Sequence, residues 1–167
     1  MKNPEAYLVG KLILAVDDEP DVLEALEELL DQCIVHTATE YETACKLMDM
    51  NQYSAVILDI MGVRGYDLLK LAKKKGSPAL MLTAHALSPE NLKKSVQLGA
   101  GAYIPKERMV DIAGYLAEMI ETAQLWDGVS CGWFTRLRSF FDREFGTGWT
   151  DKDRAFWEAF KENCMST

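Results

Sequence analysis

The hydrophobic positions of this chain fall into two kinds of segment that alternate along the sequence. Short apolar runs rich in branched side chains are typical of strands that are covered on both faces of a sheet. Longer stretches, in which apolar residues recur every three or four positions, predict amphipathic helices. The predicted strands lie in residues 11–16, 33–37, 56–61, 78–82 and 102–104. The predicted helices lie in residues 20–30, 39–48, 66–75, 88–98 and 108–125.

Five strands that alternate with five helices predict an α/β fold, a parallel sheet with helices on both faces and right-handed crossovers. For five such units in about 115 residues, the economical arrangement is a flavodoxin-like doubly wound sheet with strand order 2-1-3-4-5. That order makes the first and third strands neighbours. We therefore expect Asp17 and Asp18, which follow the first strand, to converge with Asp59 at the carboxyl end of the third.

Three carboxylates so close together repel one another, and proteins tolerate this mainly where a cation binds or a proton is shared. Oxygen ligands of this kind favour Mg²⁺. Thr83 follows the fourth strand and Lys106 follows the fifth, so both are expected at the same edge of the sheet. A metal and a lysine would neutralise phosphoryl oxygens, a hydroxyl would donate a hydrogen bond, and a carboxylate would act as the nucleophile.

These residues, in this order, resemble the receiver domain of two-component response regulators over about residues 10–126. The resemblance implies that Asp59 is the phosphoacceptor, which takes a phosphoryl group from a sensor histidine kinase or a phosphotransfer protein. It also implies a Mg²⁺ site made by Asp17, Asp18, Asp59 and the main-chain carbonyl of Met61. Such a protein is a signalling switch, and it catalyses only its own phosphoryl transfer and hydrolysis.

The resemblance assigns roles to three further residues. Lys106 would pair with the phosphoryl oxygens, and Thr83 would move toward them on phosphorylation. Tyr103 occupies the position of the family's aromatic switch residue and would move with Thr83. The surface of the fourth helix, fifth strand and fifth helix, which receivers generally use, would then contact a downstream protein or a second copy of the chain.

Two features depart from the usual family pattern. The loop after Asp59 is about two residues shorter than in most receivers, and this loop shapes kinase docking and phosphoryl lifetime. The family favours proline after the lysine, whereas here Pro105 precedes Lys106 and Glu107 follows it. The peptide bond after Lys106 is therefore expected to be trans, because a cis bond without proline costs roughly 2.5–4 kcal/mol.

Residues 127–167 are predicted to form a separate helical extension with three of the four tryptophans. One amphipathic helix is expected from Trp133 to Phe145, ended by Gly146, and a second is expected to be capped by Thr150. Their aromatic surface needs a partner: the receiver itself, a second copy, or another surface such as a protein or a membrane. About 40 residues without a basic recognition helix are too few for the usual DNA-binding output module, so no direct DNA binding is expected.

Net charge, hydropathy and cysteine content indicate which partners and which cellular location to expect. The net charge is −8, with 12 basic and 19 acidic side chains in residues 1–126, which argues against general nucleic-acid binding. No apolar segment is long enough to span a membrane and the N-terminus lacks a signal-peptide core, so a cytoplasmic location is expected. The four cysteines show no paired metal spacing and are predicted to be reduced thiols. They are Cys33, Cys45, Cys131 and Cys164.

Two alternatives to the signalling switch remain at this stage. A pseudo-receiver would keep the fold as a scaffold without phosphorylation, and the short loop and Glu107 are its only support. A phosphatase of the haloacid dehalogenase type also uses a strand-end aspartate and Mg²⁺. That class needs a second acid two residues after the nucleophile, where this chain has Met61, so the phosphatase is the weaker alternative.

Overall fold

The computed structural model of the chain describes residues 3–125 and 131–165. Its centre is a five-stranded parallel sheet in the order β2-β1-β3-β4-β5, which confirms the predicted topology. The strands are β1 (Leu12–Val16), β2 (Ile34–Ala38), β3 (Ala55–Leu58), β4 (Ala79–Thr83) and β5 (Ala102–Pro105). All four residues of β3 are buried, as expected for a central strand covered on both faces.

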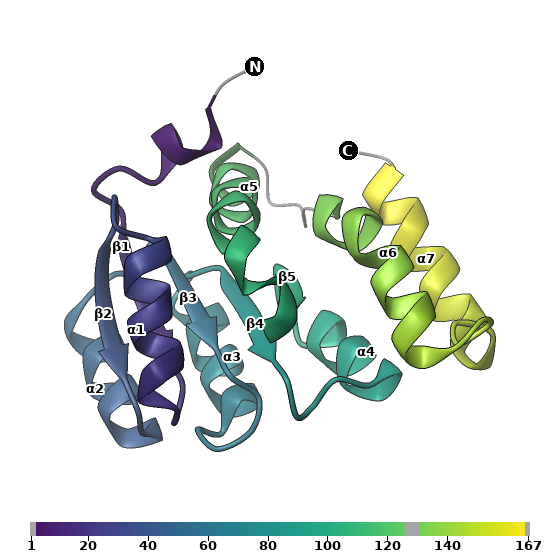
Figure 1. Ribbon diagram of the computed structural model, residues 1–167, viewed down its shortest axis with the longest axis horizontal. Helices are drawn as coiled ribbons and strands as arrows, with labels where there is room; N and C mark the ends of the chain where they lie inside the picture. Colours follow the sequence, from purple (N-terminus) through teal and green to yellow (C-terminus); the bar gives the residue numbers. More distant parts are fainter. Residues whose placement is uncertain (1–2, 126–130, 166–167) are drawn as a thin grey trace.

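Helices cover both faces of the sheet. Figure 1 shows α1 and α5 on one face and α2, α3 and α4 on the other. These helices are α1 (Pro20–Leu29), α2 (Tyr41–Met50), α3 (Gly65–Lys74), α4 (Pro89–Gln97) and α5 (Ile112–Leu125). Two more follow, α6 (Gly132–Phe145) and α7 (Arg154–Met165), and 3₁₀ helices occupy η1 (Pro4–Tyr7), η2 (Lys106–Asp111) and η3 (Asp151–Asp153). Within the described ranges, no helix combines the length and the apolar character that a membrane span requires.

The register of the sheet brings the predicted acids together. Val16 of β1 pairs with Leu58 of β3, so the residues that follow, Asp17 and Asp59, leave neighbouring strands at the same level. Further along the same sheet, Thr83 of β4 pairs with Pro105 of β5, directly before Lys106. The carboxyl ends of four adjacent strands therefore deliver their polar residues to one edge.

Two predicted helix starts are wrong in detail. The helix expected over residues 108–125 begins at Ile112, because Lys106–Asp111 forms the 3₁₀ helix η2 and Arg108 has the non-helical angles φ −106° and ψ 15°. Thr150 does not cap the last helix through its side chain, because η3 comes between it and α7. Ser88 does cap α4, since its hydroxyl accepts a hydrogen bond from the main-chain N–H of Asn91 at 3.1 Å.

Most aromatic side chains of α6 and α7 are buried, Phe145 and Phe156 are partly buried, and the receiver's own surface covers some of them. The ring of Phe141 in α6 lies against the ring of Tyr103 in β5, with centroids 6.1 Å apart. The ammonium of Lys93 in α4 lies 2.7 Å from a carboxylate oxygen of Asp153 in η3. The two helices, here called the C-terminal hairpin, lie beside β5, α4 and α5 (Figure 1). Of the three burial sites predicted from the sequence, the receiver's surface is contacted here, but most of the rings pack against one another within the two helices, which was not predicted.

The prediction of four reduced cysteines is wrong for one pair. Cys131 and Cys164 form a disulfide with their α-carbons 5.5 Å apart. The cause is the antiparallel arrangement of α6 and α7, which brings the start of one helix beside the end of the other. Cys33 and Cys45 are free thiols, as predicted. Burial is the largest contribution that raises the pKa of Cys33 to about 11, so this thiol stays protonated at neutral pH.

Candidate functional site

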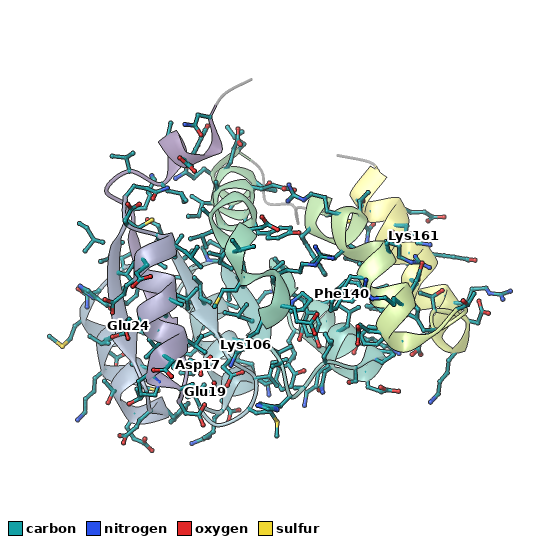
Figure 2. All side chains as sticks on the ribbon, in the orientation of Figure 1. Asp17, Glu19, Glu24, Lys106, Phe140 and Lys161 are labelled. Carbon is teal, nitrogen blue, oxygen red and sulfur yellow. A yellow bond between two sulfur atoms is a disulfide. The ribbon has the colours of Figure 1, made fainter. Side chains whose placement is uncertain are left out.

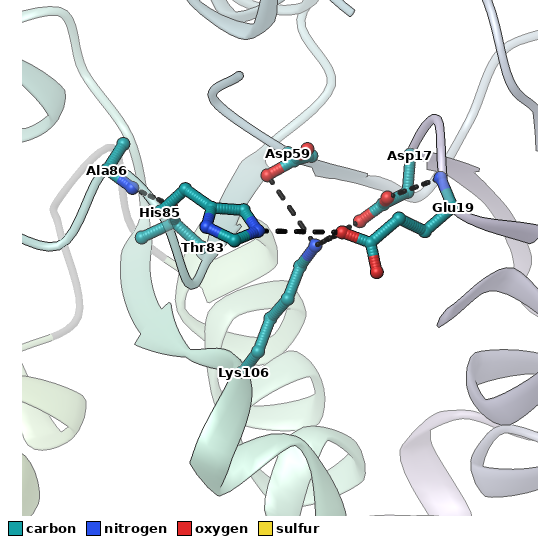
Figure 3. A network of polar contacts seen from close by, with 7 residues as sticks. All are labelled: Asp17, Glu19, Asp59, Thr83, His85, Ala86 and Lys106. Atoms are coloured by element: carbon teal, nitrogen blue, oxygen red, sulfur yellow. Dashed lines mark hydrogen bonds and ion pairs between the residues drawn. The ribbon is translucent and has the colours of Figure 1, made fainter. Parts of the chain in front are cut away.

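Lys106 stands at the centre of a buried polar cluster at the carboxyl edge of the sheet. Its ammonium lies 2.9 Å from Oδ2 of Asp17 and 3.8 Å from Oδ1 of Asp59. The side chain of Lys106 is 12% exposed, that of Asp17 2% and that of Asp59 7%, so water screens these charges little. Figure 3 shows the lysine reaching from η2 toward carboxylates on both sides.

The three acids that follow β1 form a second part of the cluster. Carboxylate oxygens of Asp17, Asp18 and Glu19 lie within 4.8 Å of one another. The main-chain N–H of Glu19 donates a hydrogen bond to Oδ1 of Asp17, and the Glu19 carboxylate lies 3.6 Å from the Lys106 ammonium. Glu19 was not predicted as a site residue. Its place in the acidic run of residues 17–19 was the available signal, but its approach to Lys106, 87 residues away in the sequence, was not predictable from that run.

The charges in this cluster act on Asp59. Burial, followed by the negative charge of Asp17, raises the pKa of Asp59 from 3.8 to about 6, although Lys106 opposes the shift. For Lys106, burial acts against the charged form, but Asp17, Asp59 and Glu19 outweigh it and the pKa of the ammonium rises above its ordinary value. The lysine is therefore charged at neutral pH, whereas ionisation of Asp59 costs free energy in the folded protein.

This cost predicts a pH-dependent gain in stability for Asp59→Asn. Because the folded state raises the pKa of Asp59, its contribution to stability is complete below about pH 3.8 and is lost as the pH rises through about 6. Without divalent cations at pH 7.5, the variant should therefore exceed the wild type by about 1 to 3 kcal/mol in free energy of unfolding. Urea titrations between pH 4 and 8 measure this, and the gap should close toward pH 4.

The control for that comparison is Asp31→Asn, which neutralises an exposed acid outside the cluster. It should change the free energy of unfolding by less than about 0.5 kcal/mol at every pH. A gain for Asp59→Asn that is equally large at pH 4 would show that charge at residue 59 is not its cause.

The donor set fits a divalent cation and an anion beside it. Oδ2 of Asp17 and Nζ of Lys106 are buried, and among the described residues neither has a hydrogen-bond partner, because their 2.9 Å contact lacks hydrogen-bond geometry. A metal ion would use the carboxylate oxygen, and a phosphoryl oxygen would use the ammonium. Oxygen ligands on short acidic side chains suit Mg²⁺. Its presence would also relieve the repulsion among the acids.

The loop after Asp59 lies close to these acids. Gly62 has φ +87°, and a Cβ there would come within 2.6 Å of the Asp18 carboxylate carbon. Only glycine allows the main chain to pass so near the acid. The carbonyl of Met61, the predicted fourth metal ligand, belongs to the peptide unit that joins Met61 to Gly62. The Met61 side chain itself is 56% exposed.

The shortness of this loop is accommodated at Gly65. The main chain of Gly65 lies against that of Asp59 and Ile60, and its N–H donates to the carbonyl of Ile60 at 3.2 Å. A Cβ at this position would lie only 2.8 Å from the α-carbon of Ile60 and 2.9 Å from the carbonyl carbon of Asp59. Arg64, just before it, has the left-handed φ of 55°. The loop thus closes by direct main-chain contact beneath Asp59.

Gly65→Ala is therefore expected to destabilise the protein by about 1 to 3 kcal/mol and to displace Asp59, because the main chain of Asp59 and Ile60 must move. Urea unfolding gives the free energy, and phosphorylation by a small phosphodonor gives the effect on the site. Gly114→Ala in α5 is the matched control, since apart from its chain neighbours and its own helix backbone no atom lies within 4 Å of a Cβ there. That substitution should stabilise by up to about 1 kcal/mol, and a similar gain at residue 65 would contradict the close contact.

Thr83 and Tyr103 are both fully buried and meet at one residue. Oγ1 of Thr83 accepts a hydrogen bond from the N–H of Ala86 at 3.1 Å, and the hydroxyl of Tyr103 donates to the carbonyl of Ala86 at 2.9 Å. Burial is the main cause of the raised pKa of Tyr103, so its hydroxyl is a donor throughout the physiological range. The strand-end threonine and the β5 aromatic are thus joined through the connection between β4 and α4.

The peptide bond after Lys106 agrees with the sequence-based prediction. The described residues contain no cis peptide bond, so the bond between Lys106 and Glu107 is trans. With this backbone the lysine still reaches Asp17 and Asp59. The exchanged order of proline and lysine therefore does not remove the ammonium from the site.

Comparison with known proteins agrees with this geometry. The family model described as the response regulator receiver domain matches residues 13–114, more than half of the chain. This chain belongs to the response regulator receiver family. The matched residues run from β1 into α5, so they include each of the four strand ends that build the polar cluster.

The curated relatives are plant response regulators. Two-component response regulator ARR10 of Arabidopsis thaliana is 34% identical over 109 residues, which is 61% of this chain and 20% of that protein. Two-component response regulator ARR12 of the same plant is 30% identical over 150 residues, 86% of this chain and 22% of that protein. The receiver chain thus spans only about a fifth of the length of these relatives.

Solved receiver structures share the fold. The receiver domain of the Francisella response regulator 1452 aligns with a TM-score of 0.61 at 21% identity, covering 69% of this chain and 99% of that one. NtrX from Brucella abortus aligns with a TM-score of 0.62 at 25% identity, covering 80% of this chain and 29% of that one. The first likeness, at so low an identity, bears on the fold alone.

Proposed function

We propose that this receiver accepts a phosphoryl group on Asp59 from the phosphohistidine of a sensor histidine kinase or a phosphotransfer protein, and that phosphorylation switches its protein contacts. The observation that carries the proposal is the buried ammonium of Lys106 between Asp17 and Asp59. An acid whose pKa is raised to about 6 is a carboxylate nucleophile at neutral pH, and the fixed cation beside it can pair with the negative phosphoryl oxygens after transfer.

Each residue of the cluster has a part in the proposed transfer. A carboxylate oxygen of Asp59 attacks the phosphorus, and the bond from phosphorus to the histidine nitrogen breaks. Lys106 stabilises the negative oxygens of the phosphoryl group as they pass, and the hydroxyl of Thr83 donates a hydrogen bond to one of them. Mg²⁺ bound to Asp17, Asp18, Asp59 and the carbonyl of Met61 would neutralise further charge.

The proposed role also suggests how the chain is divided into domains and which partners it contacts. We assign residues 10–126 to the receiver and residues 127–167 to an extension that does not bind DNA; the boundary lies outside the described residues. The proposed output is contact with a downstream protein, and a second copy bound through the α4, β5 and α5 face or the C-terminal helices is the alternative partner. Receivers are generally not true enzymes, and the proposed chemistry is limited to phosphoryl transfer to Asp59 and its hydrolysis. The proposed location of the protein is the cytoplasm.

The test is incubation of the whole chain with acetyl phosphate and Mg²⁺, followed by measurement of its intact mass. The proposal predicts one added phosphoryl group, and none for Asp59→Asn. Where the acyl phosphate hydrolyses too fast to accumulate, a beryllofluoride complex that depends on Mg²⁺ reports the same site. A wild type that shows neither phosphorylation nor Mg²⁺-dependent beryllofluoride binding would contradict the proposal and favour the scaffold alternative.

A further inference from the structure

The C-terminal hairpin contacts the receiver along a single face. Its Phe141 lies against Tyr103 of β5, its Asp153 pairs with Lys93 of α4, and the guanidinium of Arg108 in η2 lies 5.6 Å from the ring centre of Phe140. Figure 2 shows Phe140 between the receiver and α6, whereas Asp17, Glu19 and Lys106 gather at the edge of the sheet. The hairpin therefore occupies the surface made by α4, β5 and the approach to α5.

A fourth contact extends this interface along α5. The guanidinium of Arg136 in α6 forms an ion pair with Glu118 and lies 4.5 Å from the ring centre of Tyr115. Apolar, charged and cation–π contacts from four receiver elements thus meet one hairpin. Such complementarity is that of a docked partner, because a fully buried aromatic contact is surrounded by polar pairs at the rim.

One of these contacts continues into the polar cluster. Phe141 covers the ring of Tyr103, which is fully buried, and the Tyr103 hydroxyl holds the carbonyl of Ala86. The N–H of Ala86 is in turn bonded to Oγ1 of Thr83, which ends β4 beside Pro105 and Lys106. Ala86 is therefore held from both sides. Packed and hydrogen-bonded groups therefore connect the hairpin to Thr83, the residue at the end of β4 whose hydroxyl is proposed to bind the phosphoryl group.

We propose that the C-terminal hairpin is a built-in partner of the α4, β5 and α5 face, and that its docking strengthens phosphoryl binding at Asp59 by fixing Tyr103, Ala86 and Thr83. The physical reason is preorganisation. A phosphoryl group that needs the Thr83 hydroxyl binds more weakly if it must first order the connection between β4 and α4. The inference rests on the proposed function, because it concerns the same Asp59 site.

Coupling of this kind is reciprocal. If docking of the hairpin raises the affinity of the site for a phosphoryl group, then occupancy of the site must stabilise docking by the same factor. Typical couplings correspond to about 5- to 150-fold changes in affinity. A docked hairpin also keeps this face closed, so the coupling argues against a second copy that binds through the α4, β5 and α5 face on phosphorylation.

The first measurement is calorimetric titration of the whole chain with beryllofluoride in the presence of Mg²⁺. Phe141→Leu removes the ring that covers Tyr103 but keeps an apolar side chain, and it should weaken the affinity about fivefold or more. The matched control is Phe145→Leu in the same helix. Phe145 packs on Phe141 and Trp149 within the hairpin. That variant should change the affinity less than about twofold.

The second measurement needs no variant. Amide hydrogen exchange of the wild type should slow in residues 132–145 when beryllofluoride binds. Unchanged or faster exchange there, or equal affinities for Phe141→Leu and the wild type, would overturn the coupling. If the wild type binds beryllofluoride but either of these results is found, only the proposed coupling is contradicted. A wild type that binds no beryllofluoride loses the proposed function and the coupling together.

Discussion

Replacing Lys106 with Met is expected to lower the free energy of unfolding by roughly 3 to 5 kcal/mol at pH 7.5 without divalent cations. The substitution keeps the apolar length of the side chain and removes the ammonium that lies 2.9 Å from Asp17 and 3.8 Å from Asp59. Both carboxylates are buried, so their charges would lack the nearest compensation. The cost is that of an uncompensated buried charge rather than the value of a salt bridge.

Urea unfolding of three variants separates these contributions. Lys106→Arg keeps a positive charge and should lose less stability than Lys106→Met. Lys70→Met removes an exposed lysine of α3 and should change the free energy of unfolding by less than about 0.5 kcal/mol. The deficit of Lys106→Met should shrink toward pH 4, where Asp59 is protonated, and on addition of Mg²⁺. A deficit that equals that of Lys70→Met would contradict the electrostatic role of Lys106.

The second large effect concerns the disulfide between Cys131 and Cys164. Its removal is expected to destabilise the C-terminal hairpin by roughly 3 to 4 kcal/mol, because the bond closes a loop with a sequence separation of 33. The bond lies outside the sheet, between the start of α6 and the end of α7. Reduction should therefore speed amide exchange in α6 and α7 while protection in β1, β3 and β4 stays the same.

A comparison of Cys131→Ser with Cys33→Ser makes this test specific. Only the first variant should behave like the reduced wild type, because Cys33 is a free thiol. Unchanged protection of α6 and α7 after reduction would show that aromatic packing alone maintains the hairpin. The result also predicts how stable the hairpin is in the cytosol. Thiols there are normally kept reduced, so the hairpin would depend on aromatic packing.

The sequence was sufficient for the sheet and for the convergence of its acids. Strands such as β3 are uniformly apolar because they are covered on both faces, and alternation with helices limits the topology to few choices. Once β1 and β3 are neighbours, Asp17 and Asp59 must lie together. The same reasoning placed Thr83 and Lys106 at this edge, and the structure brings Lys106 into contact with both acids.

What the sequence did not reveal depends on contacts between distant segments. The close approach of Gly65 to the Asp59 main chain is invisible in a count of loop residues. The partnership of Cys131 with Cys164 requires knowledge that α6 and α7 run antiparallel. The contact of Glu19 with Lys106, at 3.6 Å, also joins residues far apart in the sequence. Pattern periodicity likewise does not distinguish the 3₁₀ segment before Ile112 from the first turns of α5.

The most direct measurement is the position of the acyl phosphate. The phosphorylated chain is reduced with sodium borohydride, which converts a phosphorylated aspartate to homoserine, and the peptides are sequenced by mass spectrometry. Phosphoryl transfer to the buried acid beside Lys106 predicts homoserine at residue 59 and at no other position. Homoserine at residue 17 or 18, or its absence from a chain shown to be phosphorylated, would contradict the assignment of Asp59 as the phosphoacceptor.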